Sequence, residues 1–209
     1  MRAILMSIRP EWCEKIFNGE KTIEVRKTAS KVETPFTVYV YQTKHKCEKG
    51  DSRLVCDALD ELLGGGKVIG SFVCDKITCC QAYYGSSGEE HLTNLFGTEC
   101  KRACLSEQEL FDYIIGKGGK MGTGWLWHIT EPKLFDKPKE LSEFYIPCKW
   151  YEKGNGCPED CDIFDYEGSI DYSDDFCQGK RPIKRPPQSW CYVEAYRDHS
   201  GDHDTHYGI

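Results

Sequence analysis

Residues 7–12 (SIRPEW) and residues 19–26 (GEKTIEVR) decide the fold of this 209-residue chain, because they fix several elements in order. Pro10 suits the first turn of a helix, where the N–H that it lacks would have no partner anyway. Gly19 then supplies the left-handed residue that ends such a helix. Residues 21–26 alternate in polarity, as in a strand with one face toward a core. The stretch therefore predicts a strand, a short helix, a tight turn and a second strand.

Charged side chains gather on one face of this second predicted strand. Ile23 and Val25 point one way, whereas Glu24 and Arg26 point the other way, with Lys21 at the mouth of the strand. An arginine fork fits a phosphate or a base edge, a lysine supplies a point charge, and a carboxylate accepts from an exocyclic amine. The trio suits a nucleotide. The alternative is an exposed strand face with ordinary ion pairs, which would show the same spacing. Each such pair would stabilise the fold by only about 0–1 kcal/mol.

The two stretches resemble the signature of the ASCH family, a small-residue/Ile/basic/Pro opening followed by Gly-x-Lys-x-x-Glu-x-Arg. Residues 66–73 (GKVIGSFV) are similar to its glycine-bracketed central strand, residues 124–129 (GWLWHI) to its closing strand, and residues 132–135 to the segment after it. The resemblance implies an α+β fold, a PUA-like mixed β-barrel with short flanking helices. It also implies recognition of RNA or a modified nucleotide.

The cleft of this barrel is where the resemblance places the ligand. We expect six residues to contact it, namely Ser7, Arg9, Trp12, Lys21, Glu24 and Arg26. A tryptophan beside a charged cleft can stack on a base, but tryptophans also fill cores. Trp125 and Trp127 share a strand face, so we expect both to be buried or both to line the cleft.

An enzyme at the same cleft is the alternative hypothesis. The layout resembles the ASCH-like amidohydrolases that remove the acetyl group from N4-acetylcytidine, and Lys21 matches their lysine. Glu24 stands where those enzymes carry a nucleophilic threonine, and a carboxylate would act as a general base for water instead. Some ASCH members are ribonucleases. The enzyme would be an amidohydrolase or a ribonuclease with Lys21 and Glu24 as its catalytic residues.

Composition divides the chain into three expected segments: a barrel domain over residues 1–140, a Cys-rich extension over residues 141–195 and a loose tail over residues 196–209. Eight acidic residues and no Lys or Arg lie within residues 155–178, so most of the net charge of −7 belongs to the extension. Within it, residues 188–194 (QSWCYVE) are compatible with a strand that packs back on the barrel.

Thirteen cysteines require an interpretation. The pair Cys157-x-x-x-Cys161 has a chelating spacing, and with Cys148 and Cys177 it would complete a structural zinc site, with Cys191 as an alternate ligand. The other eight cysteines, from Cys13 to Cys104, show no shared ligand spacing, so we expect free and mostly buried thiols. A third functional hypothesis is therefore a zinc-stabilised module that binds a protein partner through the extension.

Hydrophobicity and charge limit the remaining classes. No run approaches the roughly 18 apolar residues of a membrane helix, and the N-terminus carries charge too early for a secretory signal. We therefore expect a cytoplasmic protein without a membrane partner. The acidic balance argues against broad non-specific coating of DNA.

Periodicity predicts the remaining elements. We expect strands at residues 36–43, 68–77 and 125–129 and helices at residues 57–63, 91–96 and 106–115. Ser106 and Glu109 match a capping box at the start of the last helix. Its core stripe is expected to be Leu110, Tyr113 and Ile114.

Overall fold

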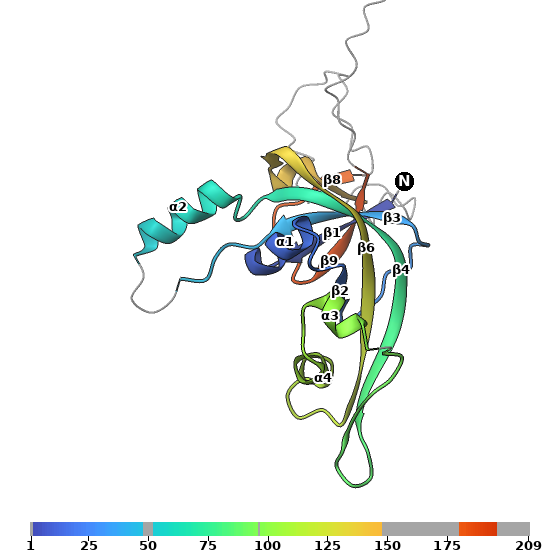
Figure 1. The fold of residues 1–209 in the computed structure, drawn as a ribbon. Helices are drawn as coiled ribbons and strands as arrows, with labels where there is room; N and C mark the ends of the chain where they lie inside the picture. The colour runs from blue at the N-terminus through green and yellow to red at the C-terminus, as the bar shows by residue number, and fades with distance from the viewer. Residues whose placement is uncertain (1, 48–51, 96, 148–179, 196–209) are drawn as a thin grey trace, which may run out of the picture.

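The computed structural model describes residues 2–47, 52–95, 97–147 and 180–195 as a mixed α+β protein (Figure 1). Most strands join one large sheet in the order β2-β6-β4-β3-β1-β9, with β5 paired to β4. In chain order the elements are β1 (Arg2–Ile8), α1 (Pro10–Phe17), β2 (Ile23–Arg26), β3 (Phe36–Gln42), α2 (Arg53–Leu63), β4 (Val68–Tyr84), β5 (Glu90–Leu92), α3 (Glu99–Ala103), α4 (Glu107–Ile115), β6 (Met121–Lys139), η1 (Leu141–Glu143), β7 (Tyr145–Pro147), β8 (Lys180–Pro182) and β9 (Trp190–Glu194).

The opening stretch folds as its sequence predicts. Pro10 occupies the first turn of α1, and Gly19 has a φ of 84° in the turn before β2. β1 pairs in parallel with β3, and the other pairings of the large sheet are antiparallel. Both faces of β3 are buried, because two separate core clusters pack against its alternating side chains.

The expected barrel does not close among the described strands. The hydrogen-bonded path begins at β2 and ends at β9, so these two strands are edges. Side chains link the edges instead: Arg26 Nη1 donates to Ser189 Oγ at 3.3 Å, and Trp190 Nε1 donates to Thr28 Oγ1 at 3.0 Å. The sheet is curled, and its edges are bridged by side chains rather than by a backbone ladder.

The predicted strand over residues 188–194 is confirmed as β9, which pairs antiparallel with β1. It therefore belongs to the same sheet as residues of the predicted barrel domain. The boundaries at residues 140 and 195 stay a prediction.

Helix α4 is confirmed, including its cap. Ser106 Oγ accepts from the backbone N–H of Glu109, and the Glu109 carboxylate accepts from the backbone N–H of Ser106. Leu110, Phe111 and Ile114 are buried against Ile23 and other residues of β2, β4 and β6. The core assignment of Tyr113 is wrong, since this residue is 41% exposed.

The helix predicted over residues 91–96 is wrong. Residues 90–92 form β5, in which His91 pairs with Tyr83 of β4, and the two rings stack with their centroids 5.0 Å apart. Strands β4 and β6 are longer than predicted and form the ribbon that runs away from the core in Figure 1. Pairing along this ribbon overrides the helical pattern of a short segment.

Helix α2 begins four residues before the predicted start and projects from the body of the molecule (Figure 1). A disulfide bond joins Cys56 of this helix to Cys47, with a Cα–Cα distance of 6.1 Å. The expectation of free thiols is therefore wrong for this pair. It is confirmed for Cys13, Cys74, Cys79, Cys80, Cys100 and Cys104. No helix in the described ranges is long and apolar enough to cross a membrane.

Candidate functional site

A pocket of about 800 Å³ lies where the end of β1, the start of α1 and strand β2 meet. Its lining includes the six residues singled out from the sequence, namely Ser7, Arg9, Trp12, Lys21, Glu24 and Arg26. The volume lies within the range of small-molecule and cofactor sites. The fold therefore brings the whole predicted set around one cavity.

The floor of the pocket is a row of buried charges, which we call the floor row: Lys21, Glu24 and Arg26. Their exposed fractions are only 2%, 7% and 9%. Lys21 Nζ lies 3.4 Å from Glu24 Oε2, and Arg26 Nη2 lies 3.0 Å from Glu24 Oε1. The alternative of an exposed ion-pair ladder is wrong, because β2 is covered on this face as well as on its core face.

Arg26 connects the floor row to the opening strand and to the edge strand β9. Its Nη2 donates to the Ser7 carbonyl oxygen at 2.8 Å, and its Nη1 faces Ser189. Its Nε is buried without a hydrogen-bond partner among the described residues. Ser7 takes part through its backbone, because its hydroxyl donates to the Pro187 carbonyl oxygen at 2.6 Å.

Lys21 is held from two sides. Its Nζ donates to the Ala103 carbonyl oxygen at 2.6 Å and lies 4.8 Å from the centroid of the Trp12 ring. This cation–π contact fixes the half-buried indole at the edge of the pocket. A flat aromatic surface therefore stands beside the floor row.

Trp125 and Trp127 do not line the pocket. Trp127 is fully buried and packs edge-on against Phe36, with their ring centroids 5.7 Å apart. Trp125 is partly buried against the same core cluster. Of the two alternatives, the core role is confirmed.

Sequence reasoning missed two parts of the lining. Thr43, Lys44, His45 and Lys46 follow β3, and Glu109 with Tyr113 come from α4. The spacing of Glu109 and Tyr113, four apart and therefore on one helical face, was an available signal. The loop after β3 carried no comparable signal, since its place depends on long-range contacts.

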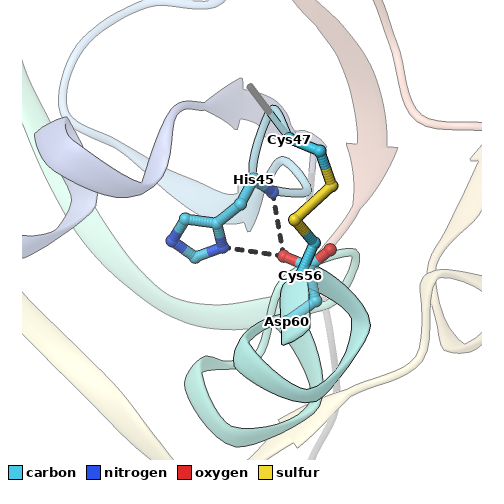
Figure 2. Close-up of a disulfide and its surroundings, with 4 residues drawn as sticks. All are labelled: His45, Cys47, Cys56 and Asp60. Carbon is cyan, nitrogen blue, oxygen red and sulfur yellow. Dashed lines mark hydrogen bonds and ion pairs between the residues drawn. A yellow bond between two sulfur atoms is a disulfide. The ribbon is translucent and has the colours of Figure 1, made fainter. Parts of the chain in front are cut away.

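The loop after β3 is tied to α2. Figure 2 shows Asp60 of α2 accepting from the backbone N–H and from Nδ1 of His45, both at 2.8 Å, beside the Cys47–Cys56 disulfide. Burial by itself would raise the pKa of Asp60. The hydrogen bonds and charge of His45 outweigh burial, and the pKa lies below its ordinary value. The carboxylate is thus held ionised at the base of the loop.

Positive charge predominates around the cavity. Five cationic residues line it against three acidic ones, although the chain as a whole carries a net charge of −7. Glu24 is neutralised by two cations, and Glu109 is engaged by the Ser106 cap. The arrangement favours an anionic ligand that also presents a flat ring and hydrogen-bond donors.

The predicted zinc ligands Cys148, Cys157, Cys161 and Cys177 lie outside the described residues. Cys191 lies on β9, half-buried among apolar residues, and burial raises the pKa of its thiol to about 11. Across the described ranges, no group of three or more His, Cys, Asp or Glu side chains could hold a metal ion. The zinc site stays a prediction.

One of three comparisons with known proteins, the scan against family models, agrees with the sequence motifs. The family model for the ASCH domain matches residues 6–112. The crystal structure of ASCH from Zymomonas mobilis is 20% identical over 66% of this chain and 73% of that chain, with a TM-score of 0.43. A serine-to-alanine mutant of that protein is 18% identical over 91% of this chain and 87% of that chain, with a TM-score of 0.48. A search of curated proteins found no match.

Proposed function

Because this chain belongs to the ASCH domain family, whose PUA-like fold is usually linked to RNA binding, we propose that its pocket binds RNA or a modified nucleotide. The observation that carries the proposal is the floor row of three buried charges beneath a predominantly positive cavity.

Burying charges is costly, and this supports a functional reason for the floor row. Removing ions from water costs several kcal/mol per ion, and well-packed apolar residues often replace a buried ion pair without loss of stability. Glu24 offers acceptor oxygens for an exocyclic amine of a base, while Arg26 and Lys21 hold the carboxylate in place. A base in this position would lie near the Trp12 ring.

Substitution of aromatic residues that line the pocket tests the proposal. Trp12→Ala and Tyr113→Ala remove ring surface from the pocket. Trp12→Ala also removes the cation–π contact with Lys21 of the floor row, whereas Tyr113→Ala leaves the contacts of the floor row in place. Base–aromatic stacking is worth about 1–3 kcal/mol, so we expect each variant to weaken binding of short single-stranded RNA about tenfold. Tyr145→Ala is the matched control, because Tyr145 is 42% exposed and does not line the pocket.

Binding would be measured by titration calorimetry with single-stranded RNA and with modified and unmodified cytidines. Equal affinity of both wall variants and the control would contradict the proposal. No measurable binding of any of these ligands by the unmodified protein would overturn it.

A hydrolase at the same pocket is the second candidate, favoured by the distance of 3.4 Å between Lys21 Nζ and Glu24 Oε2. A carboxylate and an ammonium group so close together can activate water and protonate a leaving group. Product formation from RNA or an N4-acylated cytidine that disappears in Glu24→Gln, with the fold checked by circular dichroism, would establish it. Binding without product would exclude turnover of these substrates.

A further inference from the structure

We propose that residues 43–47, which we call the rim loop, bind a phosphate group of the ligand. The pocket would then select a nucleotide over the corresponding nucleoside. This inference rests on the proposed function and adds a second ligand group, held apart from the floor row.

The charges of the rim loop are available to a ligand. Lys44 and Lys46 are exposed and line the pocket. Within the described ranges, neither lysine has a carboxylate within 4.0 Å, whereas Lys21 and Arg26 are both paired with Glu24. The floor row therefore suits a base edge, and the rim loop carries positive charge outside these close ion pairs, as a phosphate requires.

The rim loop is anchored at several points. The backbone N–H of Thr43 donates to the Ile8 carbonyl oxygen at 2.8 Å, next to the opening strand. The His45 N–H is fixed by Asp60, and Cys47 is fixed by Cys56 (Figure 2). A loop held in this way loses little conformational entropy when it contacts a ligand, so its phosphate contacts are preorganised.

His45 can add a third contact from the rim loop. Its Nδ1 is committed to Asp60, which leaves Nε2 as the ring nitrogen able to meet a ligand, and Figure 2 shows this nitrogen turned away from Asp60. The ring lines the pocket. Its orientation is therefore set by a carboxylate outside the pocket lining.

Two glycines after α2 make room for this arrangement. A Cβ atom at Gly65 would collide with the Asp60 carboxylate. A Cβ atom at Gly66 would lie 3.2 Å from Lys44 Cε, and its φ of 84° already disfavours a side chain. The glycine turn thus lets Asp60 and Lys44 pack close to the backbone.

The test compares each nucleoside with its 5′- and 3′-monophosphates by titration calorimetry. The test protein is the full chain with Lys44→Ala and Lys46→Ala. The matched control carries Lys133→Ala and Lys137→Ala, two exposed lysines of β6 that do not line the pocket. Inorganic phosphate is titrated as a separate ligand.

We expect the unmodified protein and the control to bind at least one monophosphate about tenfold more tightly than its nucleoside. In the rim-loop variant, the ratio of the affinity for the monophosphate to the affinity for the nucleoside should fall to about one. Equal affinity for nucleoside and monophosphates in the unmodified protein, or an unchanged ratio in the rim-loop variant, would overturn the inference and leave the proposed function standing.

Two further outcomes would overturn both the proposed function and the inference about the rim loop. Absence of binding to nucleosides, nucleotides and RNA would overturn the proposed function together with this inference. Inorganic phosphate that binds as tightly as the nucleotides would show a simple anion site without base recognition, and would have the same consequence.

Discussion

Glu24 and Arg26 form an ion pair of 3.0 Å between Oε1 and Nη2, with side chains only 9% and 10% exposed. They are two residues apart on one face of β2, and both are buried at the floor of the pocket. Lys21 approaches the other carboxylate oxygen at 3.4 Å. One carboxylate therefore compensates two buried cations, and its loss would leave both without an ion-pair partner among the described residues.

Glu24→Gln should accordingly destabilise the protein strongly. Removal of one partner from a buried ion pair costs about 3–5 kcal/mol, since the remaining charge stays buried. We expect the free energy of unfolding, measured by urea denaturation, to fall by about 3 kcal/mol. Glu140→Gln, which breaks the exposed pair with Lys67, should change it by less than about 1 kcal/mol. Similar small effects of both substitutions would contradict the compensation argument.

Asp60→Asn should reduce stability in a pH-dependent manner. The pKa of Asp60 in the folded protein lies below its ordinary value, although burial alone would raise it, because His45 donates to the carboxylate. A carboxyl group with a lowered pKa contributes stability above its unfolded pKa, about 4, and loses that contribution as the pH falls through the folded pKa.

The urea midpoints of the unmodified protein and Asp60→Asn should therefore differ at pH 5 and converge toward pH 3. Asp136→Asn, at an exposed position of β6, is the control and should show little difference over this range. A constant difference between the unmodified protein and Asp60→Asn from pH 5 to pH 3 would refute the role of the ionised carboxylate.

Loss of the Cys47–Cys56 disulfide should destabilise the rim loop and α2. The bridge spans nine residues of sequence, and closing a loop of this size contributes about 2.5 kcal/mol in the chain-entropy model. We expect Cys47→Ser with Cys56→Ser to lower stability by about that amount and to increase hydrogen exchange in residues 43–47. Cys79→Ser, at a half-buried free thiol, is the control. Unchanged hydrogen exchange in the double variant would contradict this prediction. It would mean that the hydrogen bonds of Thr43 and His45 hold the rim loop without the disulfide.

Ser106→Ala should weaken α4 and the pocket wall that it carries. Loss of an N-cap side chain costs about 1 kcal/mol. Hydrogen bonds from Ser106 lower the pKa of Glu109, so the capping interaction is present above the ordinary pKa of a glutamate and is lost as the pH falls through the lowered value.

Thermal unfolding at pH 7 and at pH 3 would measure this dependence. The difference in melting temperature between Ser106→Ala and the unmodified protein should be larger at pH 7. Ser142→Ala, outside α4, serves as the control. An equal difference at both pH values would contradict the contribution of the ionised Glu109 carboxylate.

Local signals account for the parts of the site that the sequence predicted correctly. Pro10 marks the start of α1, and Gly19 lies in the turn that follows its end. Strand alternation separates Glu24 and Arg26 on one face of β2 from Ile23 and Val25 on the other. The same kind of reasoning located α4 through its cap. The assignment of Tyr113 to the core was wrong. Helical spacing predicts which residues share a face of a helix, but it does not predict which part of the protein that face contacts.

Non-local pairing accounts for the errors. The edge strands β2 and β9 remain unpaired with each other, although the family resemblance implies a barrel. Residues 90–92 form a strand because β4 lies beside them, and Cys47 meets Cys56 because α2 turns back toward the rim loop. None of these contacts has a short-range sequence pattern.

By itself, the sequence determined the order of β1, α1 and β2, the family signature and the three charges of the floor row, since caps, turns and alternation act within a few residues. Only the tertiary structure decided that these charges are buried beneath a cavity. It also brought Tyr113 and the rim loop to that cavity, because burial and electrostatic environment depend on segments far apart in the chain.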